Sequence, residues 1–82
     1  MPLPPVLERH SLTVVLAPGT VALSRVLSTA RSRGIAICGA VYAEQPHGRA
    51  RLQLEITADR PAAELAVRQL SRLVDVLSVR MG

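Results

Sequence analysis

Residues 49–58 read RARLQLEITA, and this stretch decides the fold more clearly than any other part of the chain. Its alternate side chains are apolar, namely Ala50, Leu52, Leu54, Ile56 and Ala58. The residues between them are polar or charged. A strict period of two is typical of a strand that buries one face and exposes the other. The sequence therefore predicts a half-buried strand, entered through a turn at residues 45–48, QPHG.

The segments before this turn alternate between strand and helix patterns. Residues 35–44 are rich in Ile, Val and small side chains, which predicts a strand that is apolar on both faces. Residues 21–33 carry apolar side chains at helical spacing, and Gly34 is placed to end that helix. Residues 10–17 alternate again and predict the first strand. Residues 18–20, PGT, then predict a turn whose threonine is a candidate helix cap.

After residue 58 the pattern becomes helical once more. Asp59-Arg60-Pro61 predicts a helix start, because proline is tolerated only in the first turn. The apolar stripe predicted for this helix consists of Ala63, Ala66, Val67, Leu70 and Val74. Residues 75–80 predict a last strand. The proline-rich residues 1–9 predict a flexible N-terminal arm, which leaves residues 10–82 as one domain.

The element order is β-α-β-β-α-β. Two helices separated by a hairpin predict an α+β, ferredoxin-like sandwich, in which both helices cover one face of a four-stranded antiparallel sheet. This fold carries many unrelated functions, so the residues must decide between them.

Missing residue types exclude several chemistries. The chain has 82 residues, of which 49% are hydrophobic, yet Tyr42 is the only aromatic residue and there is no Asn. Acyl-phosphate hydrolysis on this fold positions its substrate with an Arg and an Asn, so it is excluded. Cys38 is the single cysteine, which excludes a paired-cysteine metal or redox site and predicts a buried, inert thiol. His10 and His47 are far apart and predict surface residues. We therefore expect no catalytic residue and no metal site.

The net charge of +4 comes from ten arginines against six acidic residues, with no lysine. Such a balance allows a nucleic-acid partner. RNA-binding versions of the fold stack bases on aromatic side chains of the central strands. The corresponding positions hold no ring, being Thr13, Val15, Arg51 and Gln53. A nucleic-acid-binding ferredoxin-like protein is therefore kept only as the least favoured alternative. No signal peptide or membrane segment is predicted, so the expected location is the cytoplasm.

Three stretches resemble a known family. Residues 22–26 (ALSRV), 33–35 (RGI) and 69–79 (QLSRLVDVLSV) are similar to parts of the small regulatory subunits of acetohydroxyacid (acetolactate) synthase. The likeness extends over about residues 10–80 and indicates the short type, with one ACT domain. It implies a non-catalytic partner that binds the large subunit and raises its activity. Thiamine diphosphate and Mg²⁺ would belong to that large subunit, and this chain would hold no cofactor.

The resemblance also implies a homodimer. ACT domains of this family pair edge to edge through the second strand, here residues 35–43. Its candidate edge residues are Ile35, Ile37, Gly39 and Val41. A strand that is apolar on both faces agrees with this expectation.

Members of the family that respond to valine bind it at the dimer interface. They use an Asn and a Gly in the first turn and an Asn early in the second strand. Candidate effector-site residues on this chain are Pro18, Gly19, Thr20, Val21 and Ala36. An ungapped match puts Pro18, Val21 and Ala36 at the three key positions, and none of them supplies a side-chain amide. We therefore expect weak or absent valine feedback. The alternative is a free-standing ACT-type sensor that binds another small molecule at residues 17–21, where backbone N–H groups and the helix dipole point outward.

Overall fold

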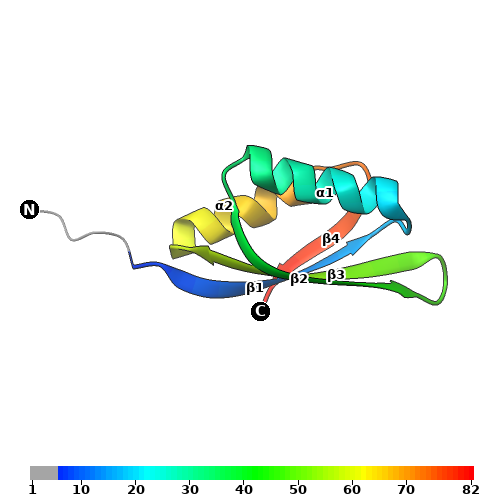
Figure 1. Cartoon of the computed structure of the whole chain (residues 1–82), viewed down its shortest axis with the longest axis horizontal. Helices are drawn as coiled ribbons and strands as arrows, with labels where there is room; N and C mark the ends of the chain where they lie inside the picture. The colour runs from blue at the N-terminus through cyan, green and yellow to red at the C-terminus, as the bar shows by residue number, and fades with distance from the viewer. Residues whose placement is uncertain (1–5) are drawn as a thin grey trace, which may run out of the picture.

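The computed structural model describes residues 6–82 and contains one sheet and two helices (Figure 1). The elements are β1 (Glu8–Leu16), α1 (Thr20–Ser32), β2 (Ala36–Gln45), β3 (Arg49–Ala58), α2 (Arg60–Ser71) and β4 (Val76–Met81). Their order along the chain is the predicted β-α-β-β-α-β.

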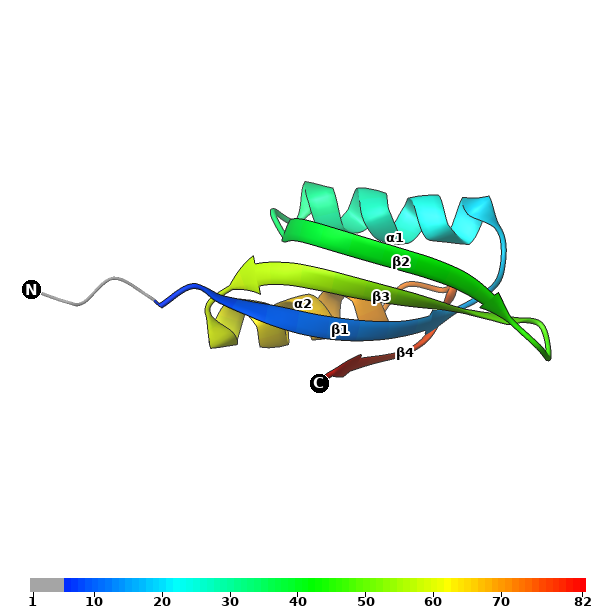
Figure 2. The same cartoon turned by 60° about the horizontal axis from the view of Figure 1, so that its bottom comes forward.

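The sheet is antiparallel throughout and its strands lie in the order β2-β3-β1-β4. The central strands β1 and β3 pair along their whole length, from Glu8 opposite Ala58 to Leu16 opposite Ala50. Both helices lie on one face of the sheet, as Figure 2 shows from a second direction. The predicted ferredoxin-like α+β fold is confirmed. The sheet order leaves β2 and β4 as its two edges.

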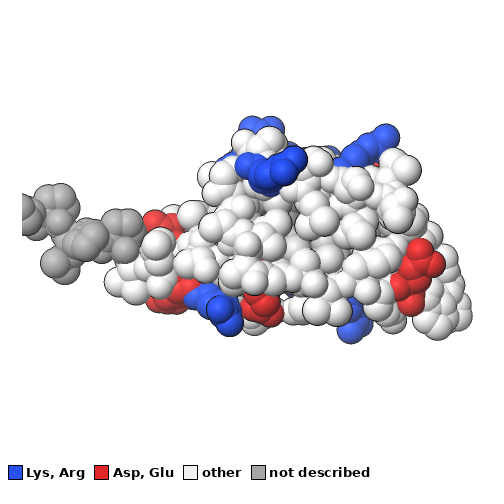
Figure 3. Space-filling model, in the orientation of Figure 1, with Lys and Arg blue, Asp and Glu red and all other residues white. Residues whose placement is uncertain are grey.

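The core lies between the sheet and the helices and is aliphatic. Its largest fully buried side chains are Leu12, Val14, Leu16, Val26, Leu52, Leu54, Ile56 and Leu70. The period-two pattern of residues 49–58 predicted the contribution of β3 correctly. Burying a side chain of this size stabilises a fold by about 1.5–3 kcal/mol. No charged side chain among the described residues is buried, and Figure 3 shows arginines and acidic residues on the surface of one face.

Three predicted boundaries need correction. Strand β1 begins at Glu8, two residues before the predicted start, because β3 is long enough to pair with Glu8 and Arg9. Residues 1–5 of the predicted arm lie outside the described part of the chain. Helix α1 is capped by Gly19 with no side-chain hydrogen bond, so the predicted threonine cap is wrong. Helix α2 ends at Ser71, and Val74, predicted in its apolar stripe, is 89% exposed.

A β-bulge divides β2 and changes which side chains face the helices. The register with β3 shifts between Ile37 and Gly39. Before the bulge, Ile37 lies opposite the buried Ile56, and after it Tyr42 lies opposite the buried Leu52. Both therefore point toward the helices. Gly39 and Val41 lie opposite Glu55 and Gln53 on the other face of the sheet. The extra residue in a bulge reverses the alternation of the residues that follow it.

Candidate effector turn and open sheet edge

The turn between β1 and α1 is built around Gly19. This residue has φ 107° and ψ 161°, a backbone conformation that is essentially restricted to glycine. Its carbonyl accepts a 3.3 Å hydrogen bond from the backbone N–H of Leu23 and so starts α1. A Cβ at this position would have no heavy atom within 4 Å. The requirement for glycine is therefore conformational and does not come from crowding.

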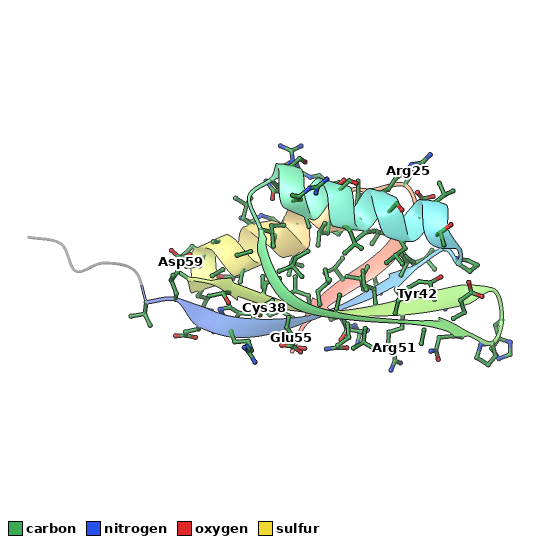
Figure 4. The ribbon with its side chains drawn as sticks, viewed as in Figure 1. Arg25, Cys38, Tyr42, Arg51, Glu55 and Asp59 are labelled. Atoms are coloured by element: carbon green, nitrogen blue, oxygen red, sulfur yellow. The ribbon has the colours of Figure 1, made fainter. Side chains whose placement is uncertain are left out.

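Tyr42 contacts this turn from the edge strand. The backbone N–H of Gly19 donates a 2.9 Å hydrogen bond to the Tyr42 hydroxyl, which itself donates to Glu44 Oε2 at 3.3 Å. Figure 4 shows Tyr42 on β2 beside the loop that leads into α1. Tyr42 was not among the predicted site residues, although its being the only residue of the Phe, Tyr and Trp types was a signal. The Gly19 N–H already has a partner, so it is not free for a ligand.

Two further bonds fix the other side of the turn. The backbone N–H of Ala17 donates to the carbonyl of Asp75 at 2.8 Å, which ties the end of β1 to the start of β4. The Asp75 carboxylate forms a 2.8 Å ion pair with Arg25 of α1. The turn is therefore held by β2 through Tyr42 and by the start of β4 through Asp75, which is itself paired with Arg25 of α1.

The other predicted effector residues lie around the start of α1. Pro18, Thr20 and Val21 are exposed, with Val21 at 65%. Thr20 and Val21 line an open groove of about 400 Å³ along α1, together with Ser24, Arg25, Ser28 and Thr29. The groove offers hydroxyl groups and one arginine, and no side-chain amide lines it.

Ala36 does not join this group within one chain. It opens β2, after the far end of α1. The 13 residues of α1 rise by about 20 Å, so the helix length separates Ala36 from the Gly19 turn. The structure thus brings Pro18, Gly19, Thr20 and Val21 together and leaves Ala36 apart.

Strand β2 pairs with β3 on one side only, and no described strand pairs with its other side. Of the predicted edge residues, Ile35 directly precedes β2 and is half-buried, as is Ile37. Val41 is 68% exposed on the face away from the helices. A groove of about 440 Å³ runs between α1 and this edge, lined in part by Leu27, Ile35 and Ile37. Unpaired backbone groups beside apolar side chains are the features by which a strand recruits another strand.

Two predictions about single residues are wrong. Cys38 is exposed, because the bulge carries it out of the alternating pattern, and its thiol lies 3.3 Å from the Glu55 carbonyl. His10 is half-buried on the helix side of β1, opposite Ile56, and its Nε2 is buried without a hydrogen-bond partner. His47 is exposed, as predicted, and takes a positive φ of 73° in the β2–β3 turn.

The sheet face away from the helices is polar at its centre. Ser11 donates to Glu55 Oε1 at 3.1 Å, and Thr13 donates to Gln53 Oε1 at 3.0 Å. Arg51 and Glu55 point away from the helices in Figure 4. Tyr42, the one residue of the Phe, Tyr and Trp types in the chain, lies on the opposite face. This sheet face therefore lacks the aromatic platform that base stacking uses.

Within residues 6–82, no group of three or more His, Cys, Asp and Glu side chains is placed to hold a metal ion. The helices in this part of the chain are also too short or too polar to cross a membrane.

A family model described as the ACT domain matches residues 19–79, which is most of the chain. No protein of curated function matches the chain in sequence. The acetolactate synthase small subunit of Thermotoga maritima has a similar structure, with a TM-score of 0.83 and 21% identity. That match covers 90% of this chain and 47% of the other, so this chain spans about half the length of that subunit.

Other similar structures belong to proteins with different names. The ACT domain of the GTP pyrophosphokinase of Chlorobium tepidum gives a TM-score of 0.78 at 12% identity, over 94% of this chain and 100% of that one. The regulatory subunit of the Thermus thermophilus aspartate kinase gives a TM-score of 0.72 at 16% identity. That match covers 93% of this chain and 51% of the other. At these identities the likeness establishes the fold.

Proposed function

The chain belongs to the ACT domain family, a family of regulatory and non-catalytic domains, and from this premise we propose that it is the regulatory small subunit of an acetolactate synthase. A resemblance in sequence carries the proposal, and a likeness in fold is consistent with it. The stretches at residues 22–26, 33–35 and 69–79 resemble such subunits in sequence. The small subunit of the Thermotoga enzyme has a similar fold. The proposed partner is the thiamine-diphosphate-dependent large subunit, whose activity this chain would raise in the cytoplasm.

The proposed active form is a homodimer joined through β2. The observation that carries this step is the free outer side of β2, flanked by the exposed Val41 and the groove beside Ile35 and Ile37. Antiparallel pairing of two copies would extend the sheet and satisfy the backbone groups of both edges. In such a dimer, Ala36 of one protomer lies toward the end of β2 that carries Tyr42 in its partner. The effector residues that one chain keeps apart would then come together.

The proposed effector response is weak or absent for valine. Pro18, Val21 and Ala36 carry no side-chain amide, and the Gly19 N–H is bonded to Tyr42. An amino-acid ligand at this turn would have to displace the tyrosine hydroxyl before it could bond to that N–H. Such a ligand would only exchange one acceptor of that N–H for another, so this bond would add little to its binding free energy.

The experiment combines the purified chain with the large subunit and measures acetolactate formation, with and without valine. We expect a several-fold rise in rate that valine hardly changes. A large subunit whose rate is the same with and without the chain overturns the activating role. Strong inhibition by valine overturns only the proposed insensitivity. Val41→Lys, which is designed to block pairing at β2, tests whether activation needs the dimer.

A free-standing ACT sensor is the second candidate function. The open groove at the start of α1, lined by Ser24, Ser28 and Thr29, favours it because these hydroxyls face solvent beside Arg25. Thermal unfolding of the chain alone, in the presence of each common amino acid, tests this candidate. An increase in Tm with one amino acid other than valine, combined with no effect on the synthase, would favour the sensor.

A further inference from the structure

A third groove lies between the two helices, on the side of the molecule away from the sheet. It has a volume of about 200 Å³ and is lined by Thr29, Arg33, Leu65, Arg68, Gln69, Arg72 and Leu73. We name this set of residues the interhelical groove. None of these residues belongs to the turn at residues 17–21 or to the β2 edge. Thr29 also lines the open groove of about 400 Å³ along α1.

Positive charge is concentrated on the helix layer. Of the ten arginines, six lie on the helices or directly after them: Arg25, Arg31, Arg33, Arg60, Arg68 and Arg72. Arg25 pairs with Asp75, and Arg60 lies 3.9 Å from Glu64. The remaining four of these six arginines have no carboxylate within ion-pair distance among residues 6–82; they are Arg31, Arg33, Arg68 and Arg72. Figure 3 shows arginine side chains along the outer side of this layer.

Arg33, Arg68 and Arg72 all line the interhelical groove. Arg68 lies in the last turn of α2 and Arg72 directly follows the helix, four residues later, so their like charges repel each other. A basic residue near a helix C-terminus is favourable by itself, and all three arginines hold such positions, Arg33 after α1, Arg68 in the last turn of α2 and Arg72 after it. That interaction does not remove the repulsion among the three side chains, and no carboxylate lines the groove. A bound carboxylate would relieve the repulsion and accept paired hydrogen bonds from a guanidinium group.

The same groove has an apolar component. Leu65 is 45% exposed, and Leu73 is half-buried. Leu65 lies on α2, whereas Leu73 follows the end of that helix at Ser71, so the two leucines border different parts of the groove. A ligand that contacts both the arginines and the leucines needs acidic and apolar groups together, as a segment of polypeptide has. The lining contains no aromatic side chain on which a nucleic-acid base could stack.

We propose that the interhelical groove is a docking surface for an acidic segment of a partner protein that carries aliphatic side chains. The arginines bind its carboxylates, and Leu65 and Leu73 contact its aliphatic side chains. If the chain is the regulatory subunit proposed above, such a segment would belong to the synthase large subunit, and this assignment rests on that proposal. The recognition chemistry itself requires no particular partner.

A designed peptide tests the recognition chemistry without the synthase. The probe is a fluorescein-labelled peptide of about fourteen residues, made of glutamates with leucines at helical spacing. Its binding to the full chain is followed by fluorescence anisotropy at several salt concentrations. We expect saturable binding that weakens with salt, because the arginines and the carboxylates attract each other through solvent.

Two matched double variants locate the binding surface. Arg68→Gln with Arg72→Gln removes two charges from the interhelical groove, whereas Arg51→Gln with Arg80→Gln removes two charges from the strands. We expect the first pair to weaken binding about tenfold and the second pair by less than about threefold. Leu65→Gln, and separately a peptide with glutamine in place of leucine, should each weaken binding about threefold. All four arginines are exposed, and circular dichroism checks that each variant is folded.

Several outcomes overturn the proposal. Equal weakening by the two arginine pairs means that only net charge attracts the peptide. No effect of the leucine replacements means that the groove has no apolar role. An oligonucleotide of equal charge that binds more tightly than the peptide, with the same sensitivity to Arg68 and Arg72, assigns the surface to nucleic acid instead. Because the large subunit is absent from this test, its result is independent of whether the chain activates the synthase.

Discussion

The Tyr42 hydroxyl accepts a 2.9 Å hydrogen bond from the backbone N–H of Gly19, 23 residues earlier in the chain. This bond links the edge strand to the turn in front of α1. It therefore couples the proposed dimer edge to the proposed effector turn.

Removing this hydroxyl should loosen the turn. Tyr42→Phe leaves the partly buried Gly19 N–H without its acceptor, so we expect a loss of about 1 kcal/mol in the free energy of unfolding. Urea denaturation measures this loss, and hydrogen exchange at Gly19 reports it locally. Glu44→Gln is the matched control, because Glu44 contacts the same hydroxyl in an exposed position without contributing to the Gly19 bond. Equal stability of Tyr42→Phe and the native chain would show that the bond contributes nothing.

Gly19 should tolerate no side chain, for a conformational reason. Gly19→Ala meets no atom within 4 Å, but φ 107° and ψ 161° are strained for any residue with a Cβ. We expect a destabilisation of about 1–3 kcal/mol, measured by chemical unfolding. Gly39→Ala is the control, since its Cβ would lie 3.5 Å from Glu55 Cβ, which is ordinary contact. The strain argument fails if the two variants unfold at the same denaturant concentration.

Asp59 caps helix α2. Its Oδ1 accepts a 2.8 Å hydrogen bond from the backbone N–H of Ala62, which otherwise has no partner in the first turn. Asp59→Ala should cost about 1 kcal/mol of stability, whereas Asp59→Asn keeps a capping oxygen and should cost much less. Thermal or urea unfolding compares the two. If Asp59→Asn lowers the free energy of unfolding as much as Asp59→Ala does, the Asp59 carboxylate has a role other than capping.

The open edge of β2 should control association. Val41→Lys places a charge at a position that is 68% exposed, so the monomer should keep its stability to within about 0.5 kcal/mol. The same charge disfavours pairing of two β2 edges, and sedimentation should show at least a tenfold weaker dimer, as a rough figure. Leu77→Lys is the matched control on β4, at the other edge, where the native side chain is 61% exposed.

Cys38 provides a second measurement of the same association, because its thiol is exposed on β2. A thiol reagent should label it readily at low protein concentration and more slowly at high concentration. In the Val41→Lys variant the labelling rate should stay the same at all concentrations. A dimer that forms without slowing the labelling would place the interface elsewhere.

The element order was predictable because the hydrophobic period changes clearly along the chain. Residues 49–58 show a period of two, and the burial of Leu52, Leu54 and Ile56 follows it. The end of α2 was less clear, since Val74 continues the helical spacing of Leu70. A tight turn follows the helix, in which the backbone N–H of Leu73 donates a 3.2 Å hydrogen bond to the carbonyl of Leu70. This turn directs Val74 toward solvent.

The candidate site was predictable only in part. The Pro18-Gly19 turn can be identified locally, because both residue types favour turns. The Tyr42 contact depends on how α1 packs beside β2, which no local pattern encodes. The bulge in β2 was hidden for a related reason. Residues 36–43 are apolar or small on both faces, so a shift of one residue leaves no trace in the pattern and Cys38 was assigned to the wrong environment.

The central position of β1 has a consequence for how the chain is made. This strand is synthesised first, yet its neighbours β3 and β4 are synthesised after it. Leu12, Val14 and Leu16 therefore stay without their sheet partners until β3 has left the ribosome. The β2–β3 hairpin is the only strand pair of residues 6–82 that is joined by a short turn, so it is the pair that forms early. Until the hairpin meets β1, the aliphatic and β-branched residues of the first strand stay exposed, which makes it a segment that can aggregate in a nascent chain.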